Sequence, residues 1–598
     1  MAKELPKRSE VELKDTWKLE DVYENVAAWE AEFDRAMALA DELAAYEGRL
    51  KSAEEVYAAL QLTEKINYYI SRLFNYAQRA SDVDTADTEN QKLVMKITSA
   101  YVGASEKIAF IQPELLALPD GVIDGFYAAK PELEYYRNFI NGILRMKAHT
   151  LSPEMEKLLA SSGEVTEACA NAFSMFNNAD LVFPEITDEN GEKVRLTHGR
   201  YVLFLESADR RVREEAFKAM YKTYYGFRNT LAAIYSGQVK SHLFTAKARK
   251  YNTCLEAAVG ANNVPKEVYL NLIEAINDNM DKMHRYVRLR KKLLGVDELH
   301  MYDLYTPLVK DANVHIPYEE ACRIIYEALE PMGEDYRAVV KEALENRWID
   351  VYENEGKRSG AYSAGIPGCH PYMLLNYAGN LDNVFTLIHE MGHSMHTWYS
   401  QKNQPFIDSE YVIFVAEVAS TCNEVLLVKH LLSKTTDKAA RAYLINHFLE
   451  SFKGTVYRQT MFAEFELKTH EMAEAGESLT PDALSAMYLD LNRKYFGEDI
   501  VVDEDIAMEW SRIPHFYYNF YVYQYATGFS AAVALANRIL TEGAPAVEDY
   551  KKFLSGGCSK SPIELLKIAG VDMASPKPVA DGLKLFDELL DEMEQLME

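Results

Sequence analysis

Apolar residues recur at three- to four-residue intervals over most of the chain, which is the spacing of amphipathic helices. From Leu19 to Leu118 the pattern predicts long helices separated by polar breaks, and the third of them covers Leu93–Ala109. Helical periodicity returns from about Arg211 to Leu344, and after the second β-rich patch it continues to a last helix over Gly582–Met597. The sequence therefore predicts a mainly α-helical protein.

Two short stretches depart from the helical pattern and favour β-structure. In residues 181–196, two β-like runs flank Asn190-Gly191, a dipeptide typical of hairpin turns. In residues 349–377, further runs predict a small sheet that leads directly into a helix near 382–400. Both patches are small, so the predicted fold class stays mainly α with small β-sheet elements.

A chain of 598 residues is long enough for several units that each bury a core. The change from helices to a hairpin is the clearest break in the pattern. We therefore expect an N-terminal helical domain over residues 1–185 and a larger, catalytic domain over residues 186–598, which contains the motif described next.

The most informative motif is His389-Glu390-x-x-His393, within the helix predicted near 382–400. Two histidines four apart share one helical face and can bind one zinc ion through their imidazoles. The glutamate is then placed to take a proton from a water molecule that the metal activates. The alternative is two hydrogen-bonded helix histidines beside a surface glutamate. With only 14 histidines in 598 residues, the metal site is favoured.

The apolar residues of this helix lie away from the histidines, at about 180–260° on a wheel of about 100° per residue. We expect this face to pack on a core, and it consists of Val384, Ile388, Met391, Met395 and Trp398. Asn380 and Asp382 are the candidate N-caps. The helix is thus predicted to be buried on one side and to present the metal ligands on the other.

A catalytic zinc site needs a third protein ligand and an open position for water. His396 shares the helical face, but it is about 10 Å from His389 along the axis, at a rise of about 1.5 Å per residue. Because each coordinating nitrogen must lie about 2 Å from the metal, one unbroken helix cannot deliver both imidazoles. We therefore expect His396 to line the site or to pack.

A second helix, predicted near 409–432, supplies a better candidate for the third ligand. Asp408 or Ser409 is its expected N-cap, and its middle is apolar apart from Glu417. An ionised carboxylate buried in such a run must be paired, protonated or bound to a metal, because its desolvation is costly. Glu417 is therefore the expected ligand, and an ion pair with a lysine or arginine is the alternative.

Glu410, Glu417 and Glu424 are spaced by seven residues, which places them along one stripe of the second helix. Glu417 has the most apolar neighbours of the three. Glu424 lies two turns further on, where an alternative role is a hydrogen bond that orients one of the ligand histidines.

Composition narrows the classes of function and the compartment. A net charge of −28 without a concentrated basic patch argues against nucleic-acid binding. No stretch approaches the roughly 18 uninterrupted apolar residues of a membrane helix, and the first residues lack the apolar core of a signal peptide. Six cysteines without CxxC spacing indicate neither a disulfide framework nor a thiolate metal site. We expect a cytoplasmic protein with reduced thiols.

Several motifs resemble the thimet-oligopeptidase-like zinc metallopeptidases, and within that family the oligoendopeptidase F group. They are Trp17–Tyr23, Ser359–Ser363, His389–His396, Phe414–Ser420 and Pro514–Gly528. The resemblance implies a multi-helix zincin-type metallopeptidase whose deep substrate cleft admits short peptides and excludes folded proteins. It also implies that His389, His393 and Glu417 bind one zinc ion per chain, with Glu390 as the base.

The resemblance further implies hydrogen-bond donors for the oxyanion of peptide hydrolysis. In the family these are a histidine and tyrosines. The candidates here are His515, Tyr518, Tyr521 and Tyr525, of which Tyr525 and His515 are preferred and Tyr518 is next. The three tyrosines are predicted to share one helical face, although core packing is an alternative role in a chain with 39 tyrosines. Residues 360–368 resemble the edge strand that aligns substrate backbone.

The expected function is zinc-dependent hydrolysis of internal peptide bonds in short unfolded oligopeptides. One alternative is a helical zinc carboxypeptidase, and another is a non-catalytic peptide-binding protein on the same fold. Glu390 argues against the second alternative, because a binding protein has no need of a general base. Short peptides are the expected partners, with no nucleic acid and no membrane, and the oligomeric state is left open.

Overall fold

The computed structural model describes residues 4–309 and 315–597. The chain forms two compact units, each of them discontinuous in sequence. The first takes in the described parts of residues 1–148, 313–430 and 535–571, and the second those of 149–312, 431–534 and 572–598. The predicted domain boundary near residue 185 divides the chain in another way, and it stays a prediction.

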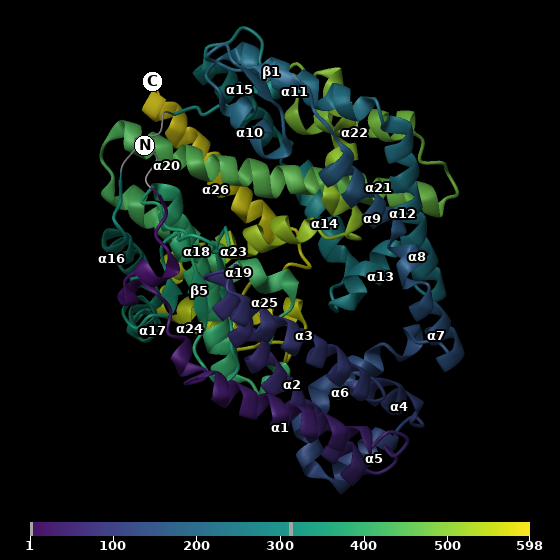
Figure 1. Cartoon of the computed structure of the whole chain (residues 1–598). Helices are drawn as coiled ribbons and strands as arrows, with labels where there is room; N and C mark the ends of the chain where they lie inside the picture. Colours follow the sequence, from purple (N-terminus) through teal and green to yellow (C-terminus); the bar gives the residue numbers. More distant parts are fainter. Residues whose placement is uncertain (1–3, 310–314, 598) are drawn as a thin grey trace. The chain divides into compact units, whose positions relative to one another are not determined.

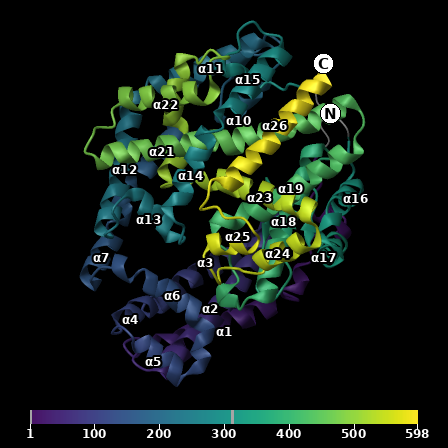
Figure 2. The ribbon, with the colours of Figure 1, turned by 180° about the vertical axis from the view of Figure 1, so that it is seen from behind.

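Helices make up most of both units, so the mainly α prediction is confirmed (Figures 1 and 2). Two of them, α19 (Ile413–Lys434) and α23 (Tyr523–Glu542), continue from one unit into the other along the chain. The other helices of the first unit are α1 (Val26–Ala44), α2 (Ala53–Asp82), α3 (Thr88–Ile108), α4 (Ile111–Ala117), α5 (Val122–Ala129), α6 (Arg137–Arg145), α16 (Tyr318–Ala328), α17 (Glu334–Glu345), α18 (Leu381–Asn403), α24 (Ala544–Leu554) and α25 (Pro562–Ile568). Those of the second unit are α7 (Pro153–Ser161), α8 (Gly163–Thr166), α9 (Ala168–Met175), α10 (His198–Glu206), α11 (Arg210–Tyr225), α12 (Arg228–Ala248), α13 (Cys254–Ala261), α14 (Lys266–Asn277), α15 (Met280–Leu294), α20 (Lys438–Ser451), α21 (Arg458–Glu474), α22 (Pro481–Phe496) and α26 (Lys577–Met597).

The three predicted N-terminal helices are α1, α2 and α3, which pack side by side (Figure 1). Helix α2 begins where the Glu55 amide donates to the Ser52 hydroxyl at 3.3 Å. The fully buried Trp29 of α1 packs in the shared core, and its indole N–H donates to the Leu73 carbonyl of α2 at 3.0 Å. Asp87 caps α3, which therefore starts five residues before the predicted Leu93.

Both predicted β-patches are present. Strands β1 (Glu185–Thr187) and β2 (Lys193–Arg195) form an antiparallel hairpin, and Gly191 in its turn has a φ of +83° that suits glycine. Strands β3 (Ile349–Asp350), β4 (Tyr362–Ala364) and β5 (Tyr372–Leu374) form a sheet of order β3-β5-β4, with β3 parallel and β4 antiparallel to β5. Strand β4 is therefore an edge strand of this sheet.

Helix α18, the predicted metal helix, follows β5 and begins at Asn380, one of its two candidate caps. The Asn383 amide donates to the Asn380 side chain at 2.8 Å, whereas Asp382 lies in the first turn and is not the cap. Val384, Ile388, Met391 and Met395 are fully buried, and each contributes about 1.5–3 kcal/mol through burial. Trp398 departs from the predicted apolar face, because its ring stays partly exposed under the Lys402 ammonium.

Helix α19 begins at Ile413, later than the predicted 409, and neither Asp408 nor Ser409 caps it. Asp408 ends a 3-10 turn, η9 (Phe406–Asp408), and its carboxylate accepts from the Asn138 side chain at 2.8 Å. The Ser409 hydroxyl donates to a carbonyl three residues earlier at 2.9 Å. Glu410 therefore precedes the helix, and the predicted stripe of three glutamates is reduced to two.

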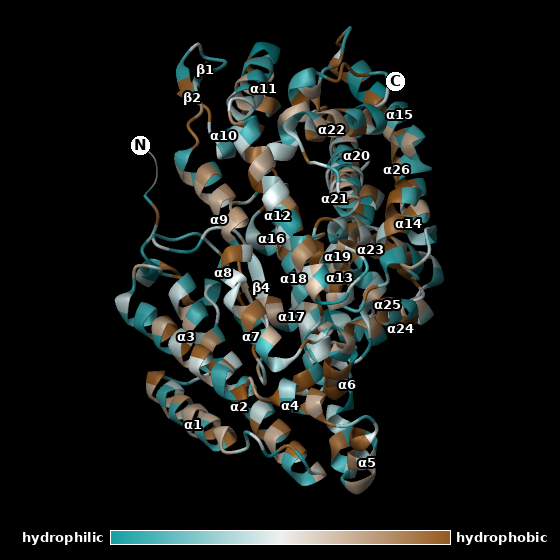
Figure 3. Ribbon diagram, turned by 90° about the vertical axis from the view of Figure 1, so that its right-hand side faces the viewer, coloured by the Kyte–Doolittle hydropathy of each residue, from teal (hydrophilic) through white to brown (hydrophobic). Residues whose placement is uncertain are grey.

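Apolar and polar residues are interspersed along the helices, as expected for helices with one packed face (Figure 3). Over residues 4–309 and 315–597, no helix combines the length and the apolarity that a membrane span requires.

Candidate metal centre and active site

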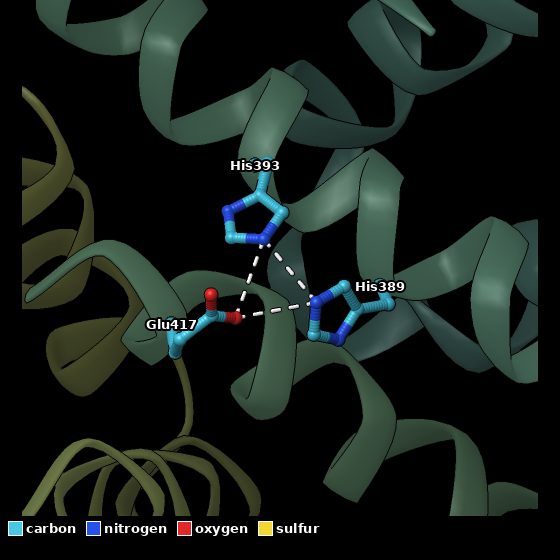
Figure 4. Close-up of side chains that lie close together, drawn as sticks. All are labelled: His389, His393 and Glu417. Atoms are coloured by element: carbon cyan, nitrogen blue, oxygen red, sulfur yellow. Dashed lines mark hydrogen bonds and ion pairs between the residues drawn. The ribbon is translucent and has the colours of Figure 1, made fainter. Parts of the chain in front are cut away.

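The Glu417 carboxylate lies beside the two motif imidazoles (Figure 4). Its Oε2 is 3.2 Å from His389 Nε2 and 3.3 Å from His393 Nε2, and the two nitrogens are 3.2 Å apart. Within the part of the chain that the structure describes, these are the side chains whose donor atoms lie close enough together to hold one metal ion. Residues 24 and 28 positions apart in sequence thus form one cluster.

The cluster has the dimensions of a tetrahedral zinc site. With metal–ligand bonds of about 2.0–2.1 Å, the donors of such a site lie about 3.3–3.4 Å from one another. The observed distances of 3.2, 3.2 and 3.3 Å match this spacing. Two imidazoles and one carboxylate suit zinc and related transition metals, whereas magnesium and calcium prefer oxygen ligands alone. Three protein donors leave one tetrahedral position for water or substrate.

Gly392, between the two histidines, allows helices α18 and α19 to approach closely. A Cβ at this position would lie 2.5 Å from the Ser420 Cα and 2.6 Å from the Ala419 carbonyl oxygen. Only glycine permits this approach, which brings Glu417 of α19 to the histidines of α18. Sequence reasoning missed this role, although glycine inside a helix costs about 1 kcal/mol and usually has a packing reason.

Glu424 holds the imidazole of His389 from the side opposite the cluster. Its Oε1 lies 2.8 Å from His389 Nδ1. Because a carboxylate accepts, the Nδ1–H donates, and this tautomer leaves the Nε2 lone pair free to bind a metal. The alternative role that the sequence left open for Glu424 is therefore the one that the geometry supports.

Glu417 is less buried than its apolar sequence neighbours suggest. Its side chain is 41% exposed, because Phe414, Val415 and Val418 fill the packed faces of α19 and the carboxylate lies on the remaining face. The carboxylate is thus not stranded in an apolar core, contrary to the expectation from its sequence neighbours. The Ser420 hydroxyl donates to Glu417 Oε2 at 3.0 Å, a contact that the sequence did not suggest.

The contacts between Glu417 and the two histidines affect the pKa values of these groups more than burial does. Burial opposes charge on both partners, but hydrogen bonds with His389 and His393 hold the pKa of Glu417 well below its usual range. Hydrogen bonds to Glu417 and Glu424 likewise raise the pKa of His389 to about 10, against the effect of burial. A metal ion therefore competes with a proton for His389.

Glu390 is 7% exposed, and its burial raises the pKa of its carboxyl group. The charges of His389 and His393 lower this pKa, and those of Glu417 and Glu424 raise it. A carboxylate whose pKa is raised is a stronger base than an ordinary glutamate, which suits proton transfer near neutral pH.

His396 packs in the core, which is one of the two positions that the sequence left open for it. It is 1% exposed, and its ring stacks on Tyr411 with centroids 3.7 Å apart. Burial lowers the pKa of His396 to about 3, so the imidazole is neutral.

The edge strand β4 lies against helix α18, which carries both motif histidines. The Ser363 hydroxyl of β4 is 2.8 Å from the Ser394 hydroxyl of α18. At Gly365, just after the strand, a Cβ would lie 2.5 Å from the Thr397 side chain, so glycine is required for this approach. The strand is thereby held next to the helix that carries the histidines.

The four candidate oxyanion donors lie in the second unit and form one aromatic group. His515 is on the 3-10 helix η12 (Pro514–Tyr517), and Tyr525 is in the first turn of α23. Ring centroids are 6.0 Å apart for His515 and Tyr525, 5.7 Å for His515 and Tyr518, and 5.6 Å for Tyr521 and Tyr525. Tyr518 is the most exposed of them, at 56%.

The prediction that Tyr518, Tyr521 and Tyr525 share one helical face is wrong, because α23 begins only at Tyr523. Asn519 and Phe520 have φ angles of +50° and +60°, which no helix contains. The rings meet across a turn instead of along a helix.

Comparison with known proteins extends the resemblance over nearly the whole chain. The model of Peptidase family M3 matches residues 203–585, and the model named Oligopeptidase F matches residues 114–183. The oligopeptidase PepF of Bacillus subtilis is 50% identical over 597 residues, with 100% of this chain and 89% of the relative covered.

Two further proteins give the same result. An oligoendopeptidase F homolog of Lactococcus lactis is 42% identical, over 99% of this chain and 98% of its own length. The crystal structure of an oligoendopeptidase F from Enterococcus faecium is 40% identical and superposes with a TM-score of 0.74, over 95% of this chain and 99% of that one.

Proposed function

Because the chain belongs to peptidase family M3 and is a metalloendopeptidase, we propose that it uses one zinc ion to hydrolyse internal bonds of short unfolded oligopeptides. The observation that carries the proposal is the triangle of donors formed by His389, His393 and Glu417, which has the spacing of a tetrahedral zinc site. The family implies a metal cofactor, and the donor set favours zinc among the metals.

When bound, the zinc ion supplies a Lewis acid that lowers the pKa of a water molecule and polarises the scissile carbonyl. Glu390 is the proposed general base, which takes the proton of the attacking water on its carboxylate and then passes it to the leaving amine nitrogen. Its burial supports this role, because the raised pKa favours both steps at neutral pH. Glu424 orients His389 throughout by accepting its Nδ1–H.

His515 and Tyr525 are the proposed donors to the oxyanion of the tetrahedral intermediate, with Tyr518 as a further candidate. The imidazole N–H and the phenol O–H are neutral donors that gain strength as negative charge develops on the substrate oxygen. Burial lowers the pKa of His515, so its imidazole carries a single N–H to donate.

Strand β4 is the proposed guide for the substrate backbone. Among the described residues, β5 is its one sheet partner, and an extended peptide added to such an edge gains main-chain hydrogen bonds without a demand for sequence. Backbone pairing of this kind requires an unfolded substrate.

We also propose that the enzyme has a deep substrate cleft. The proposed domains are an N-terminal helical domain over residues 1–185 and a catalytic domain over residues 186–598.

The proposed compartment is the cytoplasm. The six cysteines are free, which suits a reducing environment. A charge of −28 supports the absence of a nucleic-acid partner. No membrane partner is proposed.

Mass spectrometry of peptide products tests the proposal and separates it from its alternatives. A pool of peptides, some with amidated and some with free C-termini, is incubated with the zinc enzyme, with and without a chelator. Internal cleavage that the chelator abolishes and zinc restores is the expected result. A carboxypeptidase would leave the amidated peptides intact and cut only free ones, and a binding protein would cut neither.

A further inference from the structure

The turn between His515 and Tyr525 has an unusual backbone conformation. Asn519 and Phe520 both lie in the left-handed region, which asparagine tolerates but phenylalanine rarely adopts. Phe520 is 2% exposed, with its ring packed 4.5 Å from that of His470 and 5.4 Å from that of Tyr269. Such a conformation persists only where the surroundings hold it in place.

A buried carboxyl group holds this turn through a hydrogen bond to a backbone amide of the turn. The Phe520 amide donates to Glu466 Oε1 at 2.6 Å, and Glu466 on helix α21 is 0% exposed. Burial raises the pKa of Glu466 to about 8, so the carboxyl group is largely neutral at neutral pH. A neutral carboxyl group still offers its carbonyl oxygen to the amide, and no ion pair is required.

A second contact holds the other side of the turn, from helix α12. Gln238 Nε2 donates to the Tyr517 carbonyl at 3.3 Å, and it also lies 3.0 Å from His242 Nε2. Helices α12 and α21 lie side by side in the second unit, so the two anchors come from neighbouring elements (Figures 1 and 2).

Glu466 and Gln238, the two anchors of the turn, are joined by a chain of hydrogen bonds. The protons of this chain can be assigned in one consistent way. The Glu466 backbone carbonyl accepts from His470 Nδ1 at 2.8 Å, so His470 Nε2 must accept from His242 Nδ1 at 3.0 Å. His242 Nε2 then accepts from Gln238. Both imidazoles are neutral in this arrangement, and burial lowers the pKa of His242 to about 3 and that of His470 to about 4.

The side chains that flank the turn are the proposed oxyanion donors. Tyr518 lies between the two held residues, Tyr517 and Phe520, and Tyr521 directly follows them, with the two ring centroids 6.3 Å apart. His515 lies two residues before this segment and Tyr525 five residues after it, with ring centroids 6.0 Å apart. A change in the turn would therefore move the donors relative to one another, although the group that holds the turn, Glu466, is itself fully buried in α21.

We propose that Glu466 is a positioning residue for the peptidase reaction: by accepting the Phe520 amide it fixes the turn that orients His515 and Tyr525. The inference rests on the proposed role of these two side chains. Gln238, His242 and His470 complete the clamp by joining Glu466 to the Tyr517 carbonyl.

The test uses two substitutions of Glu466 in the metal-loaded enzyme. Glu466→Met keeps the length of the side chain and removes the acceptor, whereas Glu466→Gln retains a carbonyl oxygen at the same place. Glu464→Met is the matched control, since Glu464 is also buried on α21 but accepts from Tyr495 and Lys494 instead of the turn. Metal content, kcat, KM and hydrogen exchange of the peptide covering residues 514–522 are measured for each.

Glu466→Met is expected to speed exchange in this peptide and to lower kcat by about 10- to 100-fold, with KM and metal content nearly unchanged. Glu466→Gln is expected to show the hydrogen exchange and the kcat of the wild type. Glu464→Met is also expected to leave exchange and kcat at the wild-type level, even where it lowers the melting temperature. Should Glu466→Met not fold, Gln238→Leu removes the other anchor and is expected to give the same pair of changes.

Unchanged exchange at residues 514–522 in Glu466→Met would overturn the clamp, and faster exchange with an unchanged kcat would overturn its positioning role. Failure of the proposed function is recognised separately. If His515→Ala and Tyr525→Phe retain the wild-type kcat, these side chains are not the oxyanion donors, whatever the exchange of the turn shows.

Discussion

The Nδ1 atom of His389 lies 2.8 Å from the Oε1 atom of Glu424, and this contact fixes which imidazole nitrogen faces the metal cluster. The carboxylate keeps the proton on Nδ1, raises the basicity of the ring and prevents its rotation. Glu424 and Glu417 are two turns apart on α19, so one helix supplies both a proposed metal ligand and the group that orients a second one.

Substitution of Glu424 is expected to weaken metal binding without removing a ligand. Glu424→Gln should lower the affinity for zinc by about 10- to 100-fold, because a neutral amide orients His389 less firmly and polarises it less. Competition with a chromogenic chelator measures this change. Glu410→Gln is the control, since Glu410 is exposed and precedes the helix, and an equal loss in both variants would contradict the role of Glu424.

Gly392→Ala is expected to lower metal affinity and activity together. The added Cβ would meet the Ser420 Cα at 2.5 Å, so α18 and α19 must separate and Glu417 must move away from the histidines. Gly103→Ala on α3 is the control, because nothing lies within 4 Å of its Cβ, and it should be neutral or stabilising by about 0.5–1 kcal/mol. Normal zinc affinity in Gly392→Ala would show that the close approach is dispensable.

His396→Phe is expected to keep one metal ion per chain. The imidazole is neutral, buried and stacked on Tyr411, so an aromatic ring can replace it at a packing cost of about 1–3 kcal/mol. His393→Ala, by contrast, should lose the metal. Metal analysis of the purified variants tests both expectations. Loss of zinc from His396→Phe would indicate that this histidine is a metal ligand.

The stability of Glu466→Gln relative to the wild type is expected to rise with pH. The folded pKa of about 8 exceeds the ordinary 4.5, so the folded wild type binds the proton more tightly and its stability falls between these pH values. Tyr235, Tyr269 and His470 face Glu466 and stay uncharged in this range. Melting temperatures at about pH 5.5 and about pH 7.5 test this, and a constant difference between the two proteins would contradict it.

The sequence predicts those elements whose signals are local. The Asn380 cap and the Asn190-Gly191 hairpin depend on residues within a few positions, and the structure contains both. The starts of α19 and α23 depend instead on distant partners. Asp408 is engaged by Asn138, 270 positions away, and the turn before α23 is held by Glu466. A helical wheel contains no information on such partners.

The candidate site shows the same division between local and distant information. The spacing of His389 and His393 places both on one helical face, whereas their distance from Glu417 depends on how two helices cross. Gly392 determines that crossing through contacts with the backbone of α19, a partner that its own helix does not specify. The apolar neighbours of Glu417 indicated a special carboxylate but gave the wrong reason, because the side chain is 41% exposed.

The most direct test of the proposed chemistry is the metal content and turnover of Glu390→Gln. The amide keeps the size of the side chain and cannot accept the proton of the attacking water, so turnover should fall by about 10²- to 10⁴-fold while one zinc ion per chain remains bound. Turnover near the wild-type value in the zinc-loaded variant would contradict the assignment of Glu390 as the general base.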